Sequence, residues 1–360
     1  MIRALILAAG VLLVGCGGAV PDSPWVELSA PASGARVLDF VRVEDGVLAV
    51  GSIPTAHGRG PAAWHSGDGR RWRAVSVHPS SPYAFAAQLI SAGRGDRIVA
   101  LGQAFGGAHS NPRMTVWSGD ADTLVEHPQV VEMFGGPKAI AVSGAAALGG
   151  TSLLVGGWDG PGGRYGAAVW TSADGAVWQR RADDPALTSA PGEQTGAADV
   201  TTGPSGFVLV GQTLTQGRSR PLQWISGDGV SWRRIELKGD DAVASRVGCD
   251  SSGCLVLGQT LGASPRTLCW THADAAPVDG PAASVVDISQ ILRQGGEALA
   301  VTRLDGTAHL ASLTANCTDW QDIPLPVRSA DARIVALPDG LLVATTDDDG
   351  SRLWLRSETG

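Results

Sequence analysis

The sequence has few of the residues and motifs that mark common functional classes. Only 17% of its 360 residues are charged, lysine and tyrosine each occur twice, and no run of basic residues is present. A formal net charge of -8 without a basic run argues against a nucleic-acid partner. The sequence also lacks a Gly-x-Ser-x-Gly nucleophile elbow, a Gly-x-x-x-x-Gly-Lys phosphate loop and a His-Glu-x-x-His motif. The enzyme classes that these motifs define are therefore not indicated, and we expect neither a cofactor nor a metal.

Long apolar runs are also missing, except near the start of the chain. A positively charged start precedes an apolar run at 4–14, which ends in the tetrad Leu-Val-Gly-Cys at 13–16. Such a short run indicates an export signal, because a membrane-spanning helix needs about 20 residues. The tetrad resembles a bacterial lipobox, which implies a signal peptide at 1–15, lipidation of Cys16 and a lipidated tether at 16–23. We then expect an anchor on the extracytoplasmic face of the cell membrane; an ordinary secretory signal with a chance cysteine is the alternative.

Cysteine is scarce beyond this site. The remaining four are Cys249, Cys254, Cys269 and Cys317, an even number that predicts two disulfides in an exported protein. Cys249 and Cys254 flank the turn sequence Asp-Ser-Ser-Gly, so we expect a bridge across a hairpin, which leaves Cys269 with Cys317. A metal site is the alternative, but no histidine pair lies nearby.

Tryptophan, in contrast, is abundant and periodic. Of the 12 tryptophans, the first of each repeat unit stands at 64, 117, 170, 224 and 270. In three units it opens a turn of the form Ser-x-Asp-Gly-x-x-Trp, with Ser66, Asp68 and Trp72, then Ser172, Asp174 and Trp178, then Ser226, Asp228 and Trp232. Short Val- and Leu-rich runs bounded by Gly, Pro, Asp and Ser fill each unit, which predicts an all-β repeat fold.

Two degenerate units, at 298–320 and 341–360, bring the count to seven. The last unit stops after its third strand, but residues 23–29, Ser-Pro-Trp-Val-Glu-Leu-Ser, resemble the fourth strands of other units. We therefore predict one domain at 24–360, a seven-bladed β-propeller of four-stranded antiparallel blades. The N-terminal strand closes the ring and leaves no open sheet edge. Six blades is the alternative if the unit at 298–320 is not a blade.

The repeated turn resembles the Asp box, or BNR repeat, of sialidase-like propellers. The resemblance implies that the Asp caps backbone amides of a tight hairpin, that the Trp packs between sheets, and that the turn lies on the rim away from the ligand face. Side-chain chemistry agrees, since Asp and Ser satisfy turn amides, Gly supplies a positive φ, and a Trp buries ~150–250 Å². A sugar-binding platform is the alternative role for the tryptophans.

Sialidase catalysis itself is poorly matched by this sequence. The family uses an arginine triad, a Tyr assisted by a Glu, a catalytic Asp and an Arg-Ile-Pro segment. The chain has Ser52-Ile53-Pro54 without the arginine, and no Glu is recognisably paired with Tyr83 or Tyr165.

Arginines recur on the predicted ligand face. One lies four to six residues before the first Trp in five consecutive units, at Arg59, Arg113, Arg164, Arg220 and Arg266. The forked guanidinium group suits carboxylate or phosphate, so these residues could bind an anion. The alternative is that they are ordinary solvent-facing arginines.

Polar residues also align in the first strands, near the predicted channel mouth. They are Asp39, Gln88, Asp199, Arg246, Gln290 and Arg333, with Asp287 as an offset candidate. They could line a pocket, or they could hold neighbouring blades together by hydrogen bonds.

Two functions fit these observations. The first is a non-enzymatic binding or assembly platform, held to the membrane through acylated Cys16, for an envelope protein or an anionic glycan. The alternative is a carbohydrate-active hydrolase, which needs two suitably spaced carboxylates on the loop face.

Overall fold

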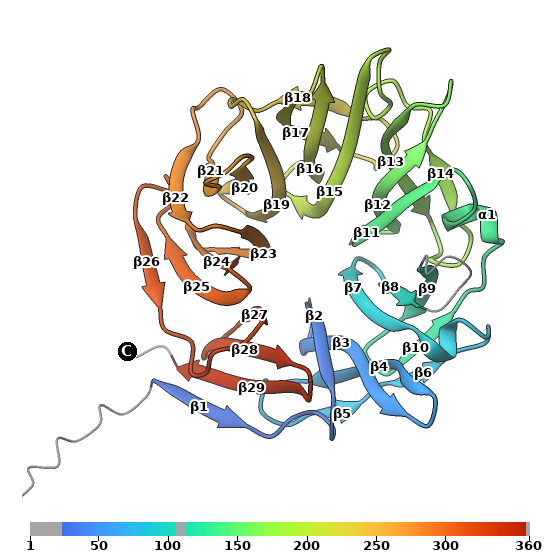
Figure 1. Ribbon diagram of the computed structural model, residues 1–360. Coiled ribbons are helices and arrows are strands. Elements are labelled where there is room, and N and C mark those ends of the chain that lie inside the picture. Colours follow the sequence, from blue (N-terminus) through green and yellow to red (C-terminus); the bar gives the residue numbers. More distant parts are fainter. Residues whose placement is uncertain (1–23, 106–111, 358–360) are drawn as a thin grey trace, which may run out of the picture.

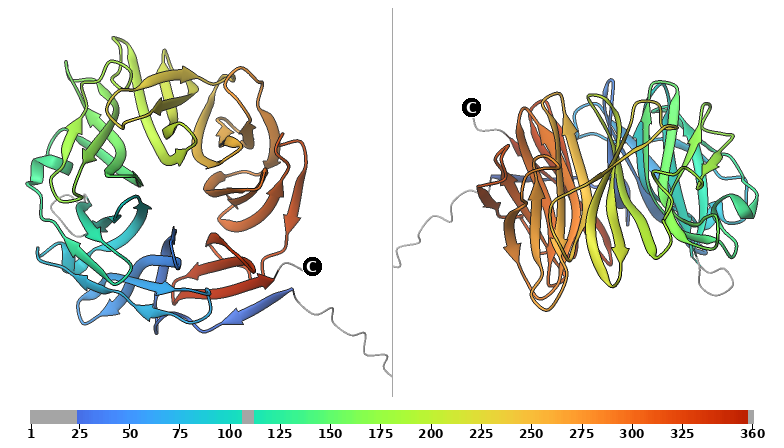
Figure 2. Two further views of the ribbon diagram at one scale, coloured as in Figure 1. Left: turned by 180° about the vertical axis from the view of Figure 1, so that it is seen from behind. Right: turned by 90° about the horizontal axis from the view of Figure 1, so that it is seen from above.

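Seven sheets stand side by side in a ring around an open centre (Figure 1), and the views from behind and above show the same disc (Figure 2). The computed structural model describes residues 24–105 and 112–357. The predicted signal peptide, Cys16 and the tether up to residue 23 lie outside the described residues. The seven sheets confirm the predicted seven-bladed β-propeller and exclude the six-bladed alternative.

Each blade is an antiparallel sheet whose first strand faces the axis. Blade 1 holds β2 (Arg36–Val43), β3 (Gly46–Thr55), β4 (Gly58–Ser66) and β5 (Arg73–Ala74); blade 2 holds β7 (Gln88–Arg94), β8 (Ile98–Ala104), β9 (Arg113–Gly119) and β10 (Thr123–Glu126). Blade 3 holds β11 (Ala139–Leu148), β12 (Thr151–Asp159), β13 (Tyr165–Ser172) and β14 (Gln179–Arg181); blade 4 holds β15 (Glu193–Gly203), β16 (Gly206–Thr215), β17 (Arg218–Ser226) and β18 (Arg233–Glu236).

The remaining three blades follow the same plan. Blade 5 holds β19 (Ala242–Asp250), β20 (Gly253–Thr260), β21 (Arg266–Trp270) and β22 (Val278–Ala282); blade 6 holds β23 (Val286–Gln294), β24 (Glu297–Leu304), β25 (Thr307–Leu313) and β26 (Trp320–Ile323). Blade 7 holds β27 (Asp331–Leu337), β28 (Gly340–Asp347), β29 (Gly350–Ser357) and, from the other end of the chain, β1 (Trp25–Leu28).

The ring closes as the sequence predicts. Strand β1 pairs antiparallel with β29, from Trp25 opposite Arg356 to Leu28 opposite Leu353. Both Glu27 carboxylate oxygens accept hydrogen bonds from Arg352, at 2.8 and 2.9 Å. The N-terminal strand thus covers the edge that blade 7 would otherwise expose.

Three short elements lie outside this plan. Strand β6 (Ser76–His78) adds to the outer edge of blade 2 by pairing parallel with β10. The 3-10 helix η1 (Ala84–Ala86) precedes β7, and helix α1 (Val131–Phe134) precedes β11. Among the residues described, no helix has the length and apolar character needed to cross a bilayer.

Large apolar side chains fill the seams between neighbouring blades. The first tryptophan of each of five units is at most 3% exposed: Trp64, Trp117, Trp170, Trp224 and Trp270. Three of these indoles donate to a carbonyl in the linker that enters their own blade: Trp170 to Met133, Trp224 to Ala186 and Trp270 to Lys238. The tryptophans therefore pack the core and anchor the linkers, which explains the period of the repeat better than a sugar platform does.

The repeated turns are built by their aspartates. Asp68 Oδ1 accepts hydrogen bonds from the Arg70 and Arg71 amides, both at 2.9 Å. Asp174 and Asp228 bind the corresponding amides of their own turns at 2.8 Å. The following glycine needs φ near +70°, and at Gly69 a Cβ would also lie 2.3 Å from Leu337 Cδ1 of blade 7. The motif is a structural turn that packs against the preceding blade of the ring.

Both predicted disulfides are present. Cys249–Cys254 bridges the hairpin of β19 and β20, and Cys269–Cys317 joins blade 5 to blade 6. The second bond closes 48 residues of chain, so it restrains the seam between two blades.

Candidate functional site

A β-bulge recurs in the innermost strand of six blades. The pairing with the second strand skips one residue there, and the residue that follows the skip is equivalent in each blade. These residues are Asp39, Ser91, Gly144, Asp199, Arg246 and Gln290. In blade 7 the strand keeps a regular register through Arg333. A bulge redirects side chains, and here it brings polar groups to the axis.

These side chains bind the backbone of the next blade. Asp39 Oδ2 accepts from the Ala92 amide at 3.0 Å, and Asp199 Oδ2 accepts from the Val247 amide at 3.0 Å. Ser91 Oγ accepts from the Ala145 amide at 3.1 Å in the same way. Each amide belongs to the residue just after the equivalent position of the following blade.

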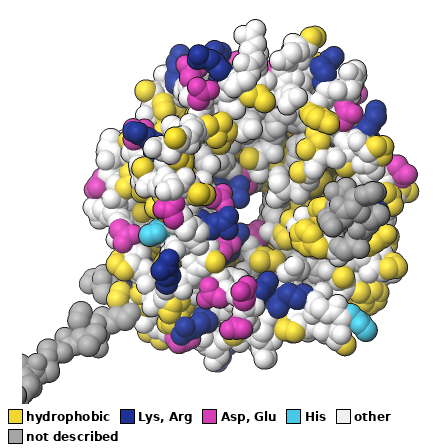
Figure 3. Space-filling model, viewed as in Figure 1, with side chains coloured by type: hydrophobic (Ala, Val, Ile, Leu, Met, Phe, Trp, Pro, Cys, Tyr) yellow, Lys and Arg dark blue, Asp and Glu magenta, His cyan; other side chains and the backbone are white. Residues whose placement is uncertain are grey.

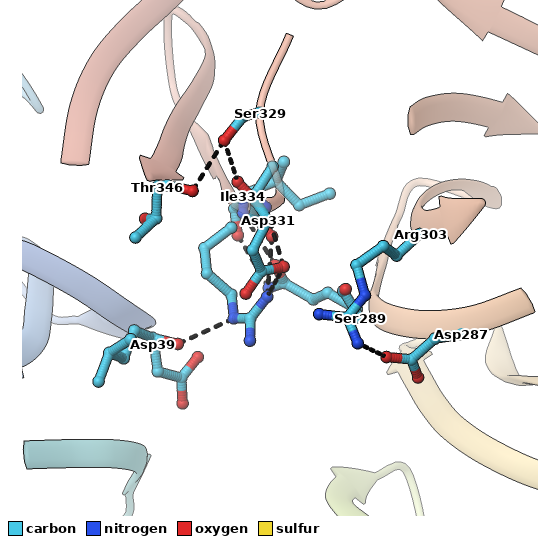
Figure 4. Close-up of polar contacts among 12 residues, drawn as sticks. Asp39, Asp287, Ser289, Arg303, Ser329, Asp331, Ile334 and Thr346 are labelled. Atoms are coloured by element: carbon cyan, nitrogen blue, oxygen red, sulfur yellow. Dashed lines mark hydrogen bonds and ion pairs between the residues drawn. The ribbon is translucent and has the colours of Figure 1, made fainter. Parts of the chain in front are cut away.

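The longer side chains make the matching bonds at the other seams. Gln290 accepts from the Ile334 amide at 2.8 Å and donates to the Ile334 carbonyl at 2.9 Å. Arg246 Nε donates to Ser289 O at 3.0 Å, and Arg333 Nε donates to Leu38 O at 2.8 Å (Figure 4). We call Asp39, Ser91, Asp199, Arg246, Gln290 and Arg333 the axial ring. The ring bridges every seam except that between blades 3 and 4, where Gly144 has no side chain.

The axial ring borders two cavities that share part of their lining. A chamber of about 130 Å³ is lined by all six ring residues. A wider vestibule of about 580 Å³ shares Asp39, Ser91, Asp199 and Gln290 with it. Figure 3 shows basic and acidic side chains at the margin of the central opening. The structure therefore brings Asp39 and Asp199 to one polar channel.

Burial changes the acidity of both channel carboxyls. Loss of hydration raises the pKa of Asp39 to about 6, although the Ala92 amide and the charge of Arg333 oppose the shift. Loss of hydration also raises the pKa of Asp199, against the charge of Arg246. Both carboxyls thus hold their proton more readily than an exposed aspartate does.

The axial alignment made from sequence is wrong at Gln88. The equivalent residue of blade 2 is Ser91, because the bulge falls between Leu89 and Ser91. Gln88 instead accepts a hydrogen bond from Ser52 at 2.9 Å. Asp287 pairs with Arg303 at 2.8 Å beside the ring (Figure 4) and does not line either axial cavity.

The five loop arginines all lie at the connection between the second and third strands of their blades. Because successive strands are antiparallel, these connections share one face of the ring. Arg59 is bound to its surroundings, with Nε donating to Ser52 Oγ at 2.9 Å and Nη2 to Gly34 O at 2.7 Å. Arg164 Nε donates to Ser189 O at 2.9 Å.

Two further loop arginines pair with acids, one in the linker that follows its blade and one in its own blade. Arg220 lies 3.4 Å from Asp240, and Arg266 lies 2.7 Å from Asp279. Arg113 differs: among the residues described, its side chain makes no hydrogen bond or ion pair, and its Nε is buried. Its guanidinium carbon lies 5.5 Å from the centre of the Tyr83 ring. Of the five predicted anion-binding arginines, Arg113 is the one whose side chain has neither a hydrogen-bond nor an ion-pair partner among the described residues.

Arg113 lies in a pocket of about 160 Å³ between β9, the end of β10 and α1. Tyr83, Met114, Val130, Val131 and Phe134 supply much of the lining. We call these residues, with Arg113, the rim pocket. The repeat pattern predicts Arg113 but not its pocket neighbours, because these come from three separate segments of the chain. Among the described residues, no cluster of three or more His, Cys, Asp or Glu could hold a metal ion.

Comparison with known proteins gives likeness in structure only. No protein-family model and no curated protein sequence matches the chain. The polysaccharide lyase Uly1 is similar with a TM-score of 0.58 and 10% identity, over 90% of each chain. The WD40 repeats of RRP9 give 0.52 and 11%, over 93% of this chain and 97% of that one.

A sialidase is among the further matches. The Trypanosoma rangeli sialidase bound to the inhibitor DANA has a TM-score of 0.48 and 13% identity. This chain is covered over 91% of its length but spans 60% of the sialidase chain. At these identities the likenesses show the fold alone, a β-propeller shared by proteins of different activities.

Proposed function

We propose that the chain is a lipid-anchored, extracytoplasmic propeller that binds another component of the cell envelope without altering it chemically. In this proposal, residues 1–15 direct export, Cys16 carries the lipid, and 16–23 tether the ring.

Two observations support an extracytoplasmic location. The chain holds two disulfides, and such bonds persist in oxidising compartments outside the cytoplasm. Strand β1 begins at Trp25 on the outer edge of blade 7, a short distance in sequence after Cys16. A tether ending there would hold the disc by one edge and leave the opposite blades free for a partner.

The observation that carries a binding role is the bonding of the axial ring. Asp39 and Asp199 are the two carboxylates of the channel, and each accepts an amide N–H from the next blade. At least one oxygen of each carboxylate is therefore bound by the fold. On the loop face, Arg113 offers a charge that has no partner among the described residues, which is suited to recognition rather than to acid–base chemistry.

The experiment compares the full-length chain with Cys16→Ala in a bacterial host. We expect the unaltered chain to fractionate with membranes and to carry a diacylglyceryl mass, and Cys16→Ala to do neither. Chemical cross-linking in intact cells should yield a saturable complex with one envelope component. A chain that stays soluble and unacylated would contradict the anchor, and absence of any saturable complex would contradict the binding role.

One observation favours a second candidate, a carbohydrate-active hydrolase. Asp39 has a pKa raised to about 6 and shares the channel with Asp199, and glycosidases pair a protonated acid with an ionised one. The test is hydrolysis of a panel of aryl glycosides and envelope polysaccharides by the purified chain. Turnover that Asp39→Asn abolishes would favour the hydrolase over the binding platform.

A further inference from the structure

Exposed apolar side chains gather around the rim pocket. Tyr83 is 45% exposed, Val130 69% and Val131 48%, and nearby Phe85 is 60% exposed. Figure 3 shows hydrophobic side chains over the sector that blades 2 and 3 occupy in Figure 1. Exposed apolar groups collected around a concave pocket are typical of a surface that another molecule covers.

The walls of the rim pocket are held in place. Two Glu126 oxygens bind the segment before η1, with the Ser80 and Ser81 amides each 2.6 Å from Oε2. Helix α1 is fixed from below, because Trp170 donates to Met133 O at 2.8 Å and Arg180 donates to Glu132 O at 2.7 Å. A preformed pocket lowers the entropy lost on binding.

Among the described residues, Arg113 is the charged side chain of the pocket that has neither a hydrogen-bond nor an ion-pair partner. Its Nε is buried without a partner among the described residues, while the Tyr83 ring covers the guanidinium from one side. The carboxylate of Glu126 also borders the pocket, but it is occupied by the Ser80 and Ser81 groups. A buried donor without an acceptor costs free energy that an incoming anion can recover.

We propose that the rim pocket binds an acidic side chain, flanked by apolar residues, in an extended segment of an envelope protein. This inference rests on the proposed binding function and names its partner and its site. The carboxylate would accept hydrogen bonds from Arg113, and a neighbouring apolar side chain would fill the space between Met114 and Phe134. Valines at the mouth would cover the rest of the segment.

The lining favours a protein segment over an anionic glycan. Besides Arg113, much of the lining is apolar, with Tyr83, Met114, Val130, Val131 and Phe134 and prolines at 82, 112 and 128. The polar lining side chains are already bound within the fold: Ser81 to Glu126, Thr115 to Trp117, His127 to Ser118, and Gln129 to the carbonyls of His127 and Ala176. Sugar hydroxyls need hydrogen-bond partners when they leave water, and this lining leaves few for them. Leucine or phenylalanine side chains lose no hydrogen bonds to water when they enter the pocket, and burial of their apolar surface favours binding.

The test uses two synthetic peptide libraries, identical except that a central Glu is replaced by Gln. The flanking positions vary among apolar residues, and both ends are blocked so that the Glu carries the only carboxylate. We expect the purified chain to retain Glu peptides over Gln peptides. For the best Glu peptide, Arg113→Gln should weaken binding roughly ten- to hundred-fold, the range for a lost hydrogen bond to a charged group.

Two further variants separate binding from folding. Val131→Glu places a carboxylate at the mouth of the pocket on an exposed position, so it should weaken binding to a similar degree while the fold is kept. Arg70→Gln removes an exposed arginine on the opposite face and should bind as the unaltered chain does. Circular dichroism of each variant checks that it is folded.

Three results would overturn the proposal. These are equal retention of the Glu and Gln libraries, full binding by Arg113→Gln, and a preference for a polyuronate such as alginate that depends on Arg113. If the libraries show no preference while the saturable envelope complex still forms, the rim pocket is the wrong site but the binding function stands. If the peptides bind and no envelope complex forms, the proposed function fails.

Discussion

The axial ring and the rim pocket differ in whether their polar side chains have hydrogen-bond partners. At the axis, Arg246 and Arg333 each donate to a carbonyl of the next blade, and Asp39 and Asp199 accept from its amides. In the rim pocket, Arg113 has no such partner among the described residues. Paired polar groups specify how blades join, whereas an unpaired charge costs free energy unless a ligand relieves it.

Residue type alone does not distinguish a structural arginine from a binding arginine in this chain. Arg113 and Arg266 occupy the same place in their repeat units. Arg266 forms an ion pair with Asp279 of the neighbouring strand, whereas Arg113 lies over the ring of Tyr83. The difference lies in what the rest of the blade places opposite each arginine.

The largest expected effect is on the pH dependence of stability. The pKa of Asp39 is higher in the folded chain than in the unfolded chain, so the folded state binds more protons between about 4 and about 6. The free energy of unfolding should therefore fall as the pH rises through that window, by at most ~3 kcal/mol. Asp39→Asn should flatten this slope, measured by urea unfolding at several pH values.

The urea unfolding series should be measured above about pH 4.5, because other carboxyl groups also change the stability at lower pH. Hydrogen bonds hold the pKa values of Asp68, Asp174 and Glu193 at about 2, so these groups stabilise the fold at neutral pH and lose that effect in acid. Asp199 is buried like Asp39 and leaves part of the slope in the variant. An unchanged slope in Asp39→Asn would show that the axial carboxyl is not buried as described.

A neutral member of the axial ring provides the next test. Gln290→Leu removes both bonds to Ile334 and leaves an amide and a carbonyl unpaired, which should lower the free energy of unfolding by ~1–3 kcal/mol. Gln212→Leu is the matched control, because this partly buried glutamine makes no side-chain hydrogen bond to the described residues. Equal urea midpoints for the two variants would contradict a structural role of the axial ring.

The smallest expected effect on stability is at the rim pocket. Arg113→Met keeps much of the apolar stem and removes an unpaired charge, so the free energy of unfolding should change by less than ~0.5 kcal/mol or rise. Differential scanning calorimetry measures this change. A clear loss of stability would mean that Arg113 serves the fold as the axial arginines do.

Much of the fold could be predicted from the sequence. The spacing of the tryptophans and the incomplete last unit indicated seven blades and the closure by β1. Two cysteines around a turn indicated the hairpin disulfide. These features depend on local spacing, which a sequence displays directly.

The site was less accessible to prediction. A bulge adds one residue without changing the apolar pattern, so the alignment took Gln88 where Ser91 stands. The partners of Arg220 and Arg266, Asp240 and Asp279, lie in or before other strands, so their pairing depends on the assembled blade. That Arg113 has no partner among the described residues also depends on the assembled blade, and so could not be predicted from the sequence.

The most direct measurement is the affinity of the best Glu peptide for Asp39→Asn and for Arg113→Gln, both shown to be folded. If the axial ring serves the fold and the rim pocket serves binding, Asp39→Asn should bind as the unaltered chain does and Arg113→Gln should bind roughly ten- to hundred-fold more weakly. Weakened binding in Asp39→Asn together with full binding in Arg113→Gln would contradict this division.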